Sequence, residues 1–247
     1  MSISCPVCQS RNTSCKYKTK ECNVYKCQSC THLFTPENTI IKKESYGLNY
    51  YQEVHKNWFD NPHYGLFDLI FLQIKTHFTN YSNFFSLKVL DVGCGKCQLL
   101  SFLSEKHGMK NLSGIDLMSM DYEAPSNINF YNDDFLEHKP PCKYDVIIST
   151  LVIEHVYNAN EFLTKIKSML TPNGIAIIVT NDCAHPLYLS ARFLSKFNFN
   201  QPLQRMFSAH HVNHFTKKTL KLLSGSIGFR FLRTISVSVP YNSLDIP

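Results

Sequence analysis

The 247-residue sequence lacks any apolar stretch as long as the roughly 18 residues that a membrane-spanning helix needs. Its first residues, Met-Ser-Ile-Ser-Cys, have no apolar core of the kind found in signal peptides, so we expect a cytoplasmic protein. Long basic runs are also missing: the formal net charge is +6, and the longest runs are pairs such as Lys42-Lys43. Because phosphate contacts demand clustered Lys and Arg, this charge pattern favours a solvated surface over a nucleic-acid interface.

Cysteine, by contrast, is abundant at one end of the chain, where six of the ten cysteines lie within the first thirty residues. Cys5-Pro-Val-Cys8 and Cys27-Gln-Ser-Cys30 are two knuckles with eighteen residues between them, which is the spacing of a zinc ribbon. Four thiolates complete a closed, tetrahedral, structural zinc site. The alternatives are two disulfides, which a reducing compartment disfavours, or a redox pair, which would not need the second knuckle.

Three further residues near the knuckles are less well explained. Cys15 and Cys22 are left over, and His32 could replace Cys30 as a ligand at the cost of a longer spacing. The ribbon is too small to hold a core of its own, so we expect the metal to supply much of its folding energy.

The stretch Lys88–Leu100 predicts a strand, a glycine turn and a helix in that order. Val89, Leu90 and Val92 form the short apolar run of a strand buried on both faces of a parallel sheet. The run stops at Gly93-Cys94-Gly95, and helical character begins at Gln98. Such a turn brings backbone N–H groups and a helix N-terminus close to a ligand. A lone Gly-x-Gly also fits an ordinary strand-to-helix turn.

Further strands and helices then alternate along the chain. We predict strands at 112–116, 129–135, 144–150 and 175–180, and an amphipathic helix over 158–170. This order implies a parallel sheet with helices on both faces, which binds ligands outside the carboxyl ends of its strands. Asp116 ends the second strand 25 positions after Asp91, where an acid can accept hydrogen bonds from ribose hydroxyls.

The order of these motifs resembles that of class I S-adenosylmethionine-dependent methyltransferases. The resemblance continues through Val152-Ile-Glu-His-Val156 and Leu170-Thr-Pro-Asn-Gly174 and covers residues 88–229. It implies a Rossmann-like, doubly wound, mostly parallel α/β fold that binds S-adenosylmethionine. Cys97 departs from the pattern, since many members have a third glycine or another small residue there. We therefore divide the chain into a zinc-ribbon module (1–36), a linker with an aromatic helical cap (37–85) and a methyltransferase domain (86–247).

The resemblance also implies the residues that bind the cofactor. Asp116 would bind the ribose, Asp134 the adenine amine with Phe135 against the ring, and Thr150 would line the sulfonium side. Gly93 and Gly95 would approach the ribose and the methionine part. By motif position the whole set is Asp91, Gly93, Cys94, Gly95, Asp116, Leu117, Asp134, Phe135 and Thr150.

The remaining segments predict a helix near 64–78, a helical insertion over 183–205, and a helix after Thr216, which is a suitable N-cap. Tyr46, Tyr50 and Tyr51 are lid candidates, because this segment often folds over the cofactor in enzymes that the chain resembles. One strand is expected over 230–239, although the fold usually ends in two antiparallel strands.

Histidines supply the candidate general bases, since histidine titrates near neutrality. His155 follows the fourth strand, and His210, His211 and His214 lie in a late loop. We single out His155 and His211, while helix capping or satisfied polar contacts stay open as the alternative for all four. We find no group of three acidic residues in the sequence that would indicate a catalytic magnesium ion.

The acceptor is the least determined part of the prediction. A zinc ribbon before a methyltransferase fold resembles bacterial enzymes that methylate deoxysugars and other small molecules. Sugar C-methyltransferases of that group tend to read Tyr-His-Glu-His near the late loop, where this chain has Ser208-Ala-His-His211, so a hydroxyl acceptor is as well supported as a carbon. The alternatives are a ribosomal RNA base methyltransferase and a non-catalytic S-adenosylmethionine-binding scaffold. The sequence predicts no oligomeric state.

Overall fold

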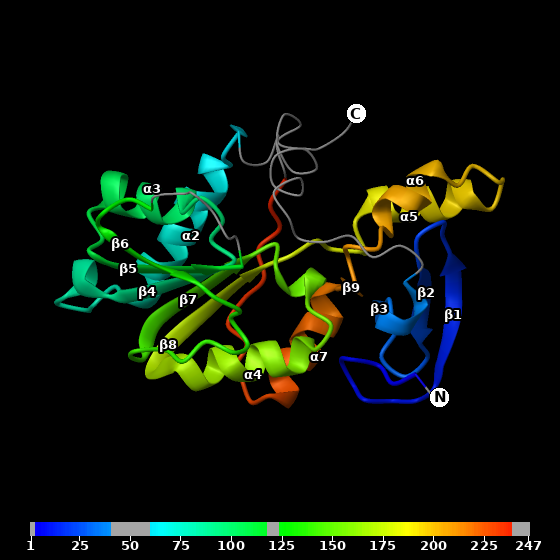
Figure 1. The fold of residues 1–247 in the computed structure, drawn as a ribbon, viewed down its shortest axis with the longest axis horizontal. Coiled ribbons are helices and arrows are strands. Elements are labelled where there is room, and N and C mark those ends of the chain that lie inside the picture. The colour runs from blue at the N-terminus through cyan, green and yellow to red at the C-terminus, as the bar shows by residue number, and fades with distance from the viewer. Residues whose placement is uncertain (1–2, 41–59, 118–123, 239–247) are drawn as a thin grey trace. The chain divides into compact units, whose positions relative to one another are not determined.

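The computed structural model describes residues 3–40, 60–117 and 124–238 (Figure 1). The chain forms two compact units. The first takes in the described residues of 1–44, 151–165 and 179–234, and the second those of 45–150, 166–178 and 235–247. The lid candidates Tyr46, Tyr50 and Tyr51 lie outside the described residues, and the boundaries at 36 and 85 stay a prediction. No described helix combines the length and apolar character needed to cross a membrane.

The second unit is built on a five-stranded sheet in the order β6-β5-β4-β7-β8. The strands are β4 (Lys88–Val92), β5 (Asn111–Asp116), β6 (Ile128–Asn132), β7 (Tyr144–Thr150) and β8 (Leu170–Val179). β4 pairs in parallel with both β5 and β7, and β5 pairs in parallel with β6. This is the predicted Rossmann-like, doubly wound α/β sheet, and the strand order reverses beside β4.

Burial explains why the apolar run of β4 becomes the central strand. Val89, Leu90 and Val92 are each at most 1% exposed, and Val146 and Ile147 of the neighbouring β7 are fully buried. Residues on both faces of a strand are buried only where both faces of the sheet are covered. The glycine turn therefore starts from a strand that is buried on both faces.

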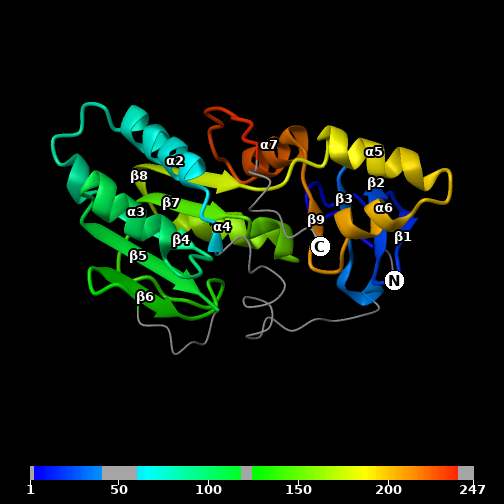
Figure 2. The same cartoon turned by 90° about the horizontal axis from the view of Figure 1, so that it is seen from above.

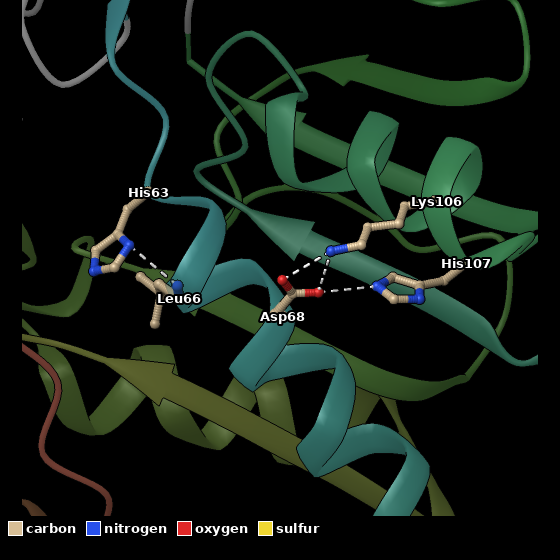
Figure 3. A network of polar contacts seen from close by, with 5 residues as sticks. All are labelled: His63, Leu66, Asp68, Lys106 and His107. Atoms are coloured by element: carbon tan, nitrogen blue, oxygen red, sulfur yellow. Dashed lines mark hydrogen bonds and ion pairs between the residues drawn. The ribbon is translucent and has the colours of Figure 1, made fainter.

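Two helices of the second unit, α2 (Tyr64–His77) and α3 (Gln98–His107), lie side by side (Figures 1 and 2). The rings of Phe67 and Phe102 meet edge to face with their centroids 5.5 Å apart. Lys106 Nζ lies 2.8 Å from both carboxylate oxygens of Asp68, and His107 Nε2 lies 3.4 Å from Oδ1 of the same carboxylate (Figure 3). The helix predicted near 64–78 is confirmed. The short 3-10 turn η3 (Phe84–Ser86) precedes β4.

The first unit contains an antiparallel sheet in the order β1-β2-β3-β9. Its strands are β1 (Thr13–Lys18), β2 (Asn23–Cys27), β3 (Leu33–Phe34) and β9 (Asn213–His214). In the pairing of β3 with β9, Leu33 lies opposite His214. The late histidine segment therefore adds a strand to the ribbon, although the two are far apart in the sequence.

The helical elements of this unit are η1 (Glu37–Thr39), η4 (Ile153–His155), α5 (Pro186–Ser195), α6 (Gln201–Met206) and α7 (Lys217–Ser226). Asn198, with φ 63°, separates α5 from α6, so the predicted insertion is two helices. Thr216 caps α7 as predicted, because its Oγ1 accepts a hydrogen bond from the N–H of Thr219 at 3.2 Å. The predicted helix over 158–170 is α4 (Ala159–Met169), which spans the division between the units.

The ribbon shares an apolar core with α5 and α6. The buried residues of this cluster are Cys22, Val24, Leu33, Cys183, Tyr188, Leu203 and Phe207. The ribbon thus has a core that it shares with later helices, in agreement with the expectation that it is too small for a core of its own. Apolar burial therefore stabilises this unit in addition to any metal.

The strand expected over 230–239 is not formed in its described part. Residues 230–238 have no regular secondary structure. Phe231, Leu232, Ile235 and Val237 are between 40% and 53% exposed, so the alternating apolar pattern does not bury one face. A strand needs a partner for its backbone groups, and apolar alternation alone does not supply one.

Candidate functional site

The loop after β4 turns through left-handed backbone conformations. Gly93 has φ 74° and Gly95 has φ 49°, which glycine adopts without steric cost. Cys97, the N-cap of α3, also lies in this region with φ 53°. A residue with a Cβ costs roughly 1–2 kcal/mol there. The position at which the sequence departs from the family pattern thus still has the conformation that favours glycine.

Gly114 of β5 provides the space in which this loop packs. A Cβ at Gly114 would lie 2.7 Å from Cys94 Sγ and 3.0 Å from Leu100 Cδ1. The Cys94 and Cys97 sulfurs are 3.7 Å apart. The hydrogen bond with Cys97, together with burial, raises the pKa of the Cys94 thiol, so Cys94 acts here as a neutral packing group. The sequence analysis missed Gly114; a glycine inside an apolar strand was the available signal.

Asp116 connects the glycine loop to the end of β5. Its Oδ2 accepts a hydrogen bond of 2.8 Å from the backbone N–H of Gly95, and the side chain is buried. The backbone carbonyl of Asp116 accepts a further bond of 3.1 Å from the N–H of Asp133, beyond β6. The loop ends of three neighbouring strands are thereby held together.

Asp91 is a carboxyl group buried within β4, only 3% exposed. Burial, and to a smaller extent the negative charge of Asp116, raise its pKa to about 8. Asp91 Oδ1 has no hydrogen-bond partner among the residues that the structure describes. A positively charged ligand beside Asp91 would favour its ionised form and so lower this pKa again.

The other predicted cofactor residues follow the neighbouring strands. Asp134 is exposed, and its Oδ1 accepts a hydrogen bond of 2.8 Å from the N–H of Leu136. Phe135 is buried, whereas Leu117 is 57% exposed. Thr150 ends β7, and its buried Oγ1 has no partner within the described parts of the chain.

These residues come together because their strands run in one direction. β6, β5, β4 and β7 are parallel neighbours, so the residues that follow them lie along the same edge of the sheet. This edge offers loop N–H groups, two buried carboxyl groups, a buried hydroxyl and a phenyl ring. It can hold an elongated ligand with hydroxyl and cationic groups.

The four knuckle cysteines converge in the first unit. The Sγ atoms of Cys5, Cys8, Cys27 and Cys30 all lie within 4.8 Å of one another. The Cys5–Cys30 and Cys8–Cys27 sulfurs are 3.6 Å and 3.5 Å apart, too far for a disulfide. Sulfurs that share one zinc ion at about 2.3 Å would lie roughly 3.8 Å apart in a tetrahedron.

Burial raises the pKa of the Cys5 and Cys30 thiols, whereas the hydrogen bonds of Cys27 favour its thiolate. Burial raises the pKa of Cys27, but hydrogen bonds with the Cys30 backbone, Cys8 and the Ser29 backbone outweigh it and lower the pKa to about 7. The geometry and the donor set therefore fit a structural zinc ion.

The remaining ribbon residues do not join this cluster. Cys15 is exposed on β1, and Cys22 belongs to the apolar core. His32 is fully buried, and its Nε2 lies 3.1 Å from Oδ1 of Asn213. Burial lowers the pKa of His32 to about 4. The suggested exchange of Cys30 for His32 is wrong, because Cys30 lies in the thiolate cluster and His32 lies in the core.

A second cluster of the first unit consists of Glu154, His155 and His211, whose ligand atoms lie within 4.8 Å of one another. Glu154 is 1% exposed, and burial raises its pKa to about 7. Thr180 Oγ1 donates to its carboxylate at 2.9 Å and Asn181 Nδ2 at 3.3 Å. The sequence analysis missed Glu154, although an acid between Ile153 and His155 in an apolar stretch was visible.

The histidines of the late segment differ in environment. His155 Nδ1 lies 2.9 Å from the carbonyl oxygen of His210, so Nδ1 carries the proton and Nε2 is the basic nitrogen. The His155 and His211 rings are 4.9 Å apart. His214 is buried in β9, where burial lowers its pKa to about 3. His214 is therefore a core histidine.

Comparison with known proteins identifies the family. A family model described as "Methyltransferase domain" matches residues 54–234. The chain belongs to this family. The match includes the glycine loop, Asp116, Asp134 and β7, and the predicted class of S-adenosylmethionine-dependent methyltransferase is confirmed.

Curated relatives match about half to two thirds of this chain. A ubiquinone biosynthesis O-methyltransferase of Rickettsia typhi (strain ATCC VR-144 / Wilmington) is 28% identical over 177 residues, which is 65% of this chain and 69% of that protein. The corresponding protein of Rickettsia bellii (strain OSU 85-389) is 34% identical over 125 residues, 47% of this chain and 50% of that protein.

Among solved structures, a sugar N-methyltransferase from Streptoalloteichus is 14% identical with a TM-score of 0.46, over 58% of each chain.

Proposed function

We propose that this methyltransferase transfers a methyl group from S-adenosylmethionine to a hydroxyl oxygen of a small molecule. The observation that carries the proposal is the similarity of the chain to curated proteins named O-methyltransferases. An oxygen nucleophile also suits a chain with candidate histidine bases, because a neutral hydroxyl must lose its proton during transfer. A carbon acceptor of a sugar is the competing outcome of the test.

The cofactor is proposed to lie along the carboxyl edge of the parallel sheet. Asp116 would accept hydrogen bonds from the ribose hydroxyls, and Asp134 one from the adenine amine with Phe135 against the ring. Gly93, Cys94 and Gly95 allow the backbone to approach the ligand closely. The residues fit the group, because a partnerless Asp91 oxygen and a second buried carboxyl group suit a cationic ligand.

Two further contacts complete this proposed cofactor site. Thr150 Oγ1 would line the sulfonium side, and Leu117 follows Asp116 as an apolar neighbour of the nucleoside. S-adenosylmethionine supplies an electrophilic methyl group, and the protein mainly supplies position.

We assign the proton transfer to His155 or His211. Hydrogen bonding of His155 Nδ1 to the carbonyl of His210 leaves Nε2 as the atom that would accept the acceptor's proton. Glu154, near both imidazoles, would stabilise the imidazolium cation that results. His155 follows Thr150 by five positions in the chain.

The thiolate cluster is proposed to bind one structural zinc ion through Cys5, Cys8, Cys27 and Cys30. Four protein ligands close the coordination sphere, so this ion would stabilise the ribbon and take no part in methyl transfer. Unoxidised cysteines at this spacing are typical of a reducing compartment, which supports a cytoplasmic location.

The test is a transfer assay with radiolabelled S-adenosylmethionine. Purified protein is incubated separately with catechol as a small hydroxyl acceptor, a deoxysugar nucleotide and ribosomal RNA, followed by mass spectrometry of the labelled product. The proposal expects an O-methyl ether on a small molecule. Label in RNA alone, or on a carbon atom, would contradict it.

A further inference from the structure

The outward face of α5 is apolar. Tyr188 and Ala191 point into the core of the first unit and are at most 8% exposed. The positions on the opposite side of the helix are large and apolar as well: Leu187, Leu189, Phe193 and Leu194, which are between 36% and 61% exposed. A helix on the surface of a globular protein normally turns polar residues outward.

The exposed apolar residues continue past the end of α5. Phe197 is 69% exposed and Phe199 is 53% exposed, and both lie in the turn that leads to α6. α5 and α6 lie side by side within this unit (Figures 1 and 2). We call the six exposed residues Leu187, Leu189, Phe193, Leu194, Phe197 and Phe199 the α5 patch. Clustered exposed leucine and phenylalanine residues mark an interaction surface more often than chance.

The charged residues of α5, of α6 and of the turn between them are all basic. Residues 183–234 contain no Asp or Glu, but they contain eight basic residues: Arg192, Lys196, Arg205, Lys217, Lys218, Lys221, Arg230 and Arg233. Lys196 directly follows α5 and Arg205 lies in α6; both are exposed. The small net charge of the whole chain conceals this segregation, which the sequence analysis overlooked.

We propose that the α5 patch docks on the surface of an anionic lipid bilayer. Phenylalanine and leucine side chains can insert between acyl chains, while Lys196 and Arg205 remain at the level of the anionic headgroups. Anionic lipid supplies both the apolar interior and the negative charge that this surface complements. Single-stranded RNA also offers negative charge, but exposed aliphatic residues such as Leu187 and Leu189 gain nothing from base stacking.

Vesicle sedimentation tests the proposal with the full-length protein. Vesicles of phosphatidylcholine alone are compared with vesicles of phosphatidylcholine mixed with phosphatidylglycerol. We expect binding to the mixed vesicles that weakens at high salt. The Phe193→Ser/Phe197→Ser variant should bind them about tenfold or more weakly, because two phenyl rings no longer insert.

Two further variants make the result specific. Lys196→Gln/Arg205→Gln should weaken binding roughly tenfold or more, and only for vesicles that contain phosphatidylglycerol. It leaves the apolar residues in place and so serves the test if the serine variant fails to fold. The control, Leu72→Ser/Phe85→Ser, removes residues of similar exposure (53% and 52%) from the second unit and should bind normally.

Three results would overturn the proposal. The first is an absence of binding to the mixed vesicles by the wild-type protein. The second is equal binding by the wild-type protein and by the α5-patch and charge variants. The third is binding to single-stranded RNA at the same salt concentration without binding to vesicles.

Discussion

The backbone N–H of Gly95 donates a hydrogen bond of 2.8 Å to Oδ2 of Asp116. These two residues belong to different motifs of the sequence, the glycine turn after β4 and the acid that ends β5. The bond fixes the orientation of the buried carboxylate relative to the loop, so one side chain links the glycine turn to the end of β5.

Replacement of Asp116 should weaken cofactor binding. In Asp116→Ala the Gly95 N–H loses its acceptor and the proposed ribose contact is lost, so we expect S-adenosylmethionine to bind about tenfold or more weakly. Isothermal titration calorimetry measures the dissociation constant. Asp68→Ala is the matched control, because Asp68 pairs with Lys106 on the helices α2 and α3 (Figure 3). Unchanged affinity in Asp116→Ala would remove the assignment of the ribose contact.

Gly114→Ala should disturb the glycine loop, because Cys94 of that loop packs against Gly114 of β5. The new Cβ would lie 2.7 Å from Cys94 Sγ, so either the loop or β5 must move, and we expect a loss of about 1–3 kcal/mol in the free energy of unfolding. The double variant Gly114→Ala/Cys94→Ala removes the closest of these atoms and should recover part of the loss. Urea unfolding of the two single variants and the double variant measures this coupling. If the stability losses of the two single variants simply add up in the double variant, the two residues do not compete for space.

The sequence predicted the parallel sheet well because each strand has a local signal. β4 and β7 are short apolar runs that end at glycine or polar residues, and β7 has the predicted bounds, Tyr144–Thr150. The thiolate cluster was equally predictable from the sequence, because each Cys-x-x-Cys knuckle places two ligands within one turn.

Contacts between distant segments could not be predicted in this way. The pairing of Leu33 with His214 has no local signal, because a two-residue strand has too few residues to show alternation. Phe207 lies just before the predicted late loop, yet it is fully buried in the core that the ribbon shares with α5 and α6. The apolar residues after Arg230 predicted a strand that does not form over the described residues 230–238, because propensity does not supply a pairing partner.

The pKa of Asp91 predicts how stability depends on pH. Its ordinary value is 3.8 and its value in the fold is about 8. Between these values the folded state holds a proton that the unfolded chain releases, so Asp91 lowers the free energy of unfolding as the pH rises from about 4 to about 8. The Asp91→Asn side chain cannot bind this proton, so the free energy of unfolding of the variant lacks this dependence on pH. Relative to the variant, the wild type should lose up to about 1.4 kcal/mol per pH unit over that interval.

Urea unfolding of both proteins at pH 5 and pH 8 measures the Asp91 effect. Asp68→Asn is the control with the opposite sign, because the hydrogen bond from Lys106 lowers the pKa of Asp68. Parallel pH dependences of wild type and Asp91→Asn would contradict a carboxyl group that stays protonated near neutral pH.

Removal of two thiolates should remove the proposed zinc. Cys8→Ser/Cys27→Ser takes one ligand from each knuckle, and we expect about one zinc ion fewer per chain by atomic emission spectrometry. Cys15→Ser is the matched control, because Cys15 lies on β1 outside the cluster. Equal zinc in all three proteins would disprove the site. Since the ribbon shares a core with α5 and α6, the double variant should lose stability without unfolding the second unit.

The last prediction concerns the proposed base. His155→Ala and His211→Ala should each retain S-adenosylmethionine affinity, and the variant that lacks the base should lose about 10²–10⁴-fold in turnover with a hydroxyl acceptor. His77→Gln serves as the control, since His77 is exposed at the end of α2, where its Nε2 lies 3.1 Å from the carbonyl oxygen of Asn173.

The pH profile separates a base from a structural histidine. If His155 Nε2 accepts the proton, the wild-type rate should rise as the imidazole becomes neutral and then level off, and this limb should vanish in His155→Ala. An acceptor with an unusually acidic hydroxyl, already ionised at the assay pH, should restore much of the lost rate because no proton remains to be moved. Loss of turnover that neither acidic acceptors nor high pH restores would instead assign His155 to the support of η4, where its Nδ1 bond to the His210 carbonyl joins two segments of the first unit.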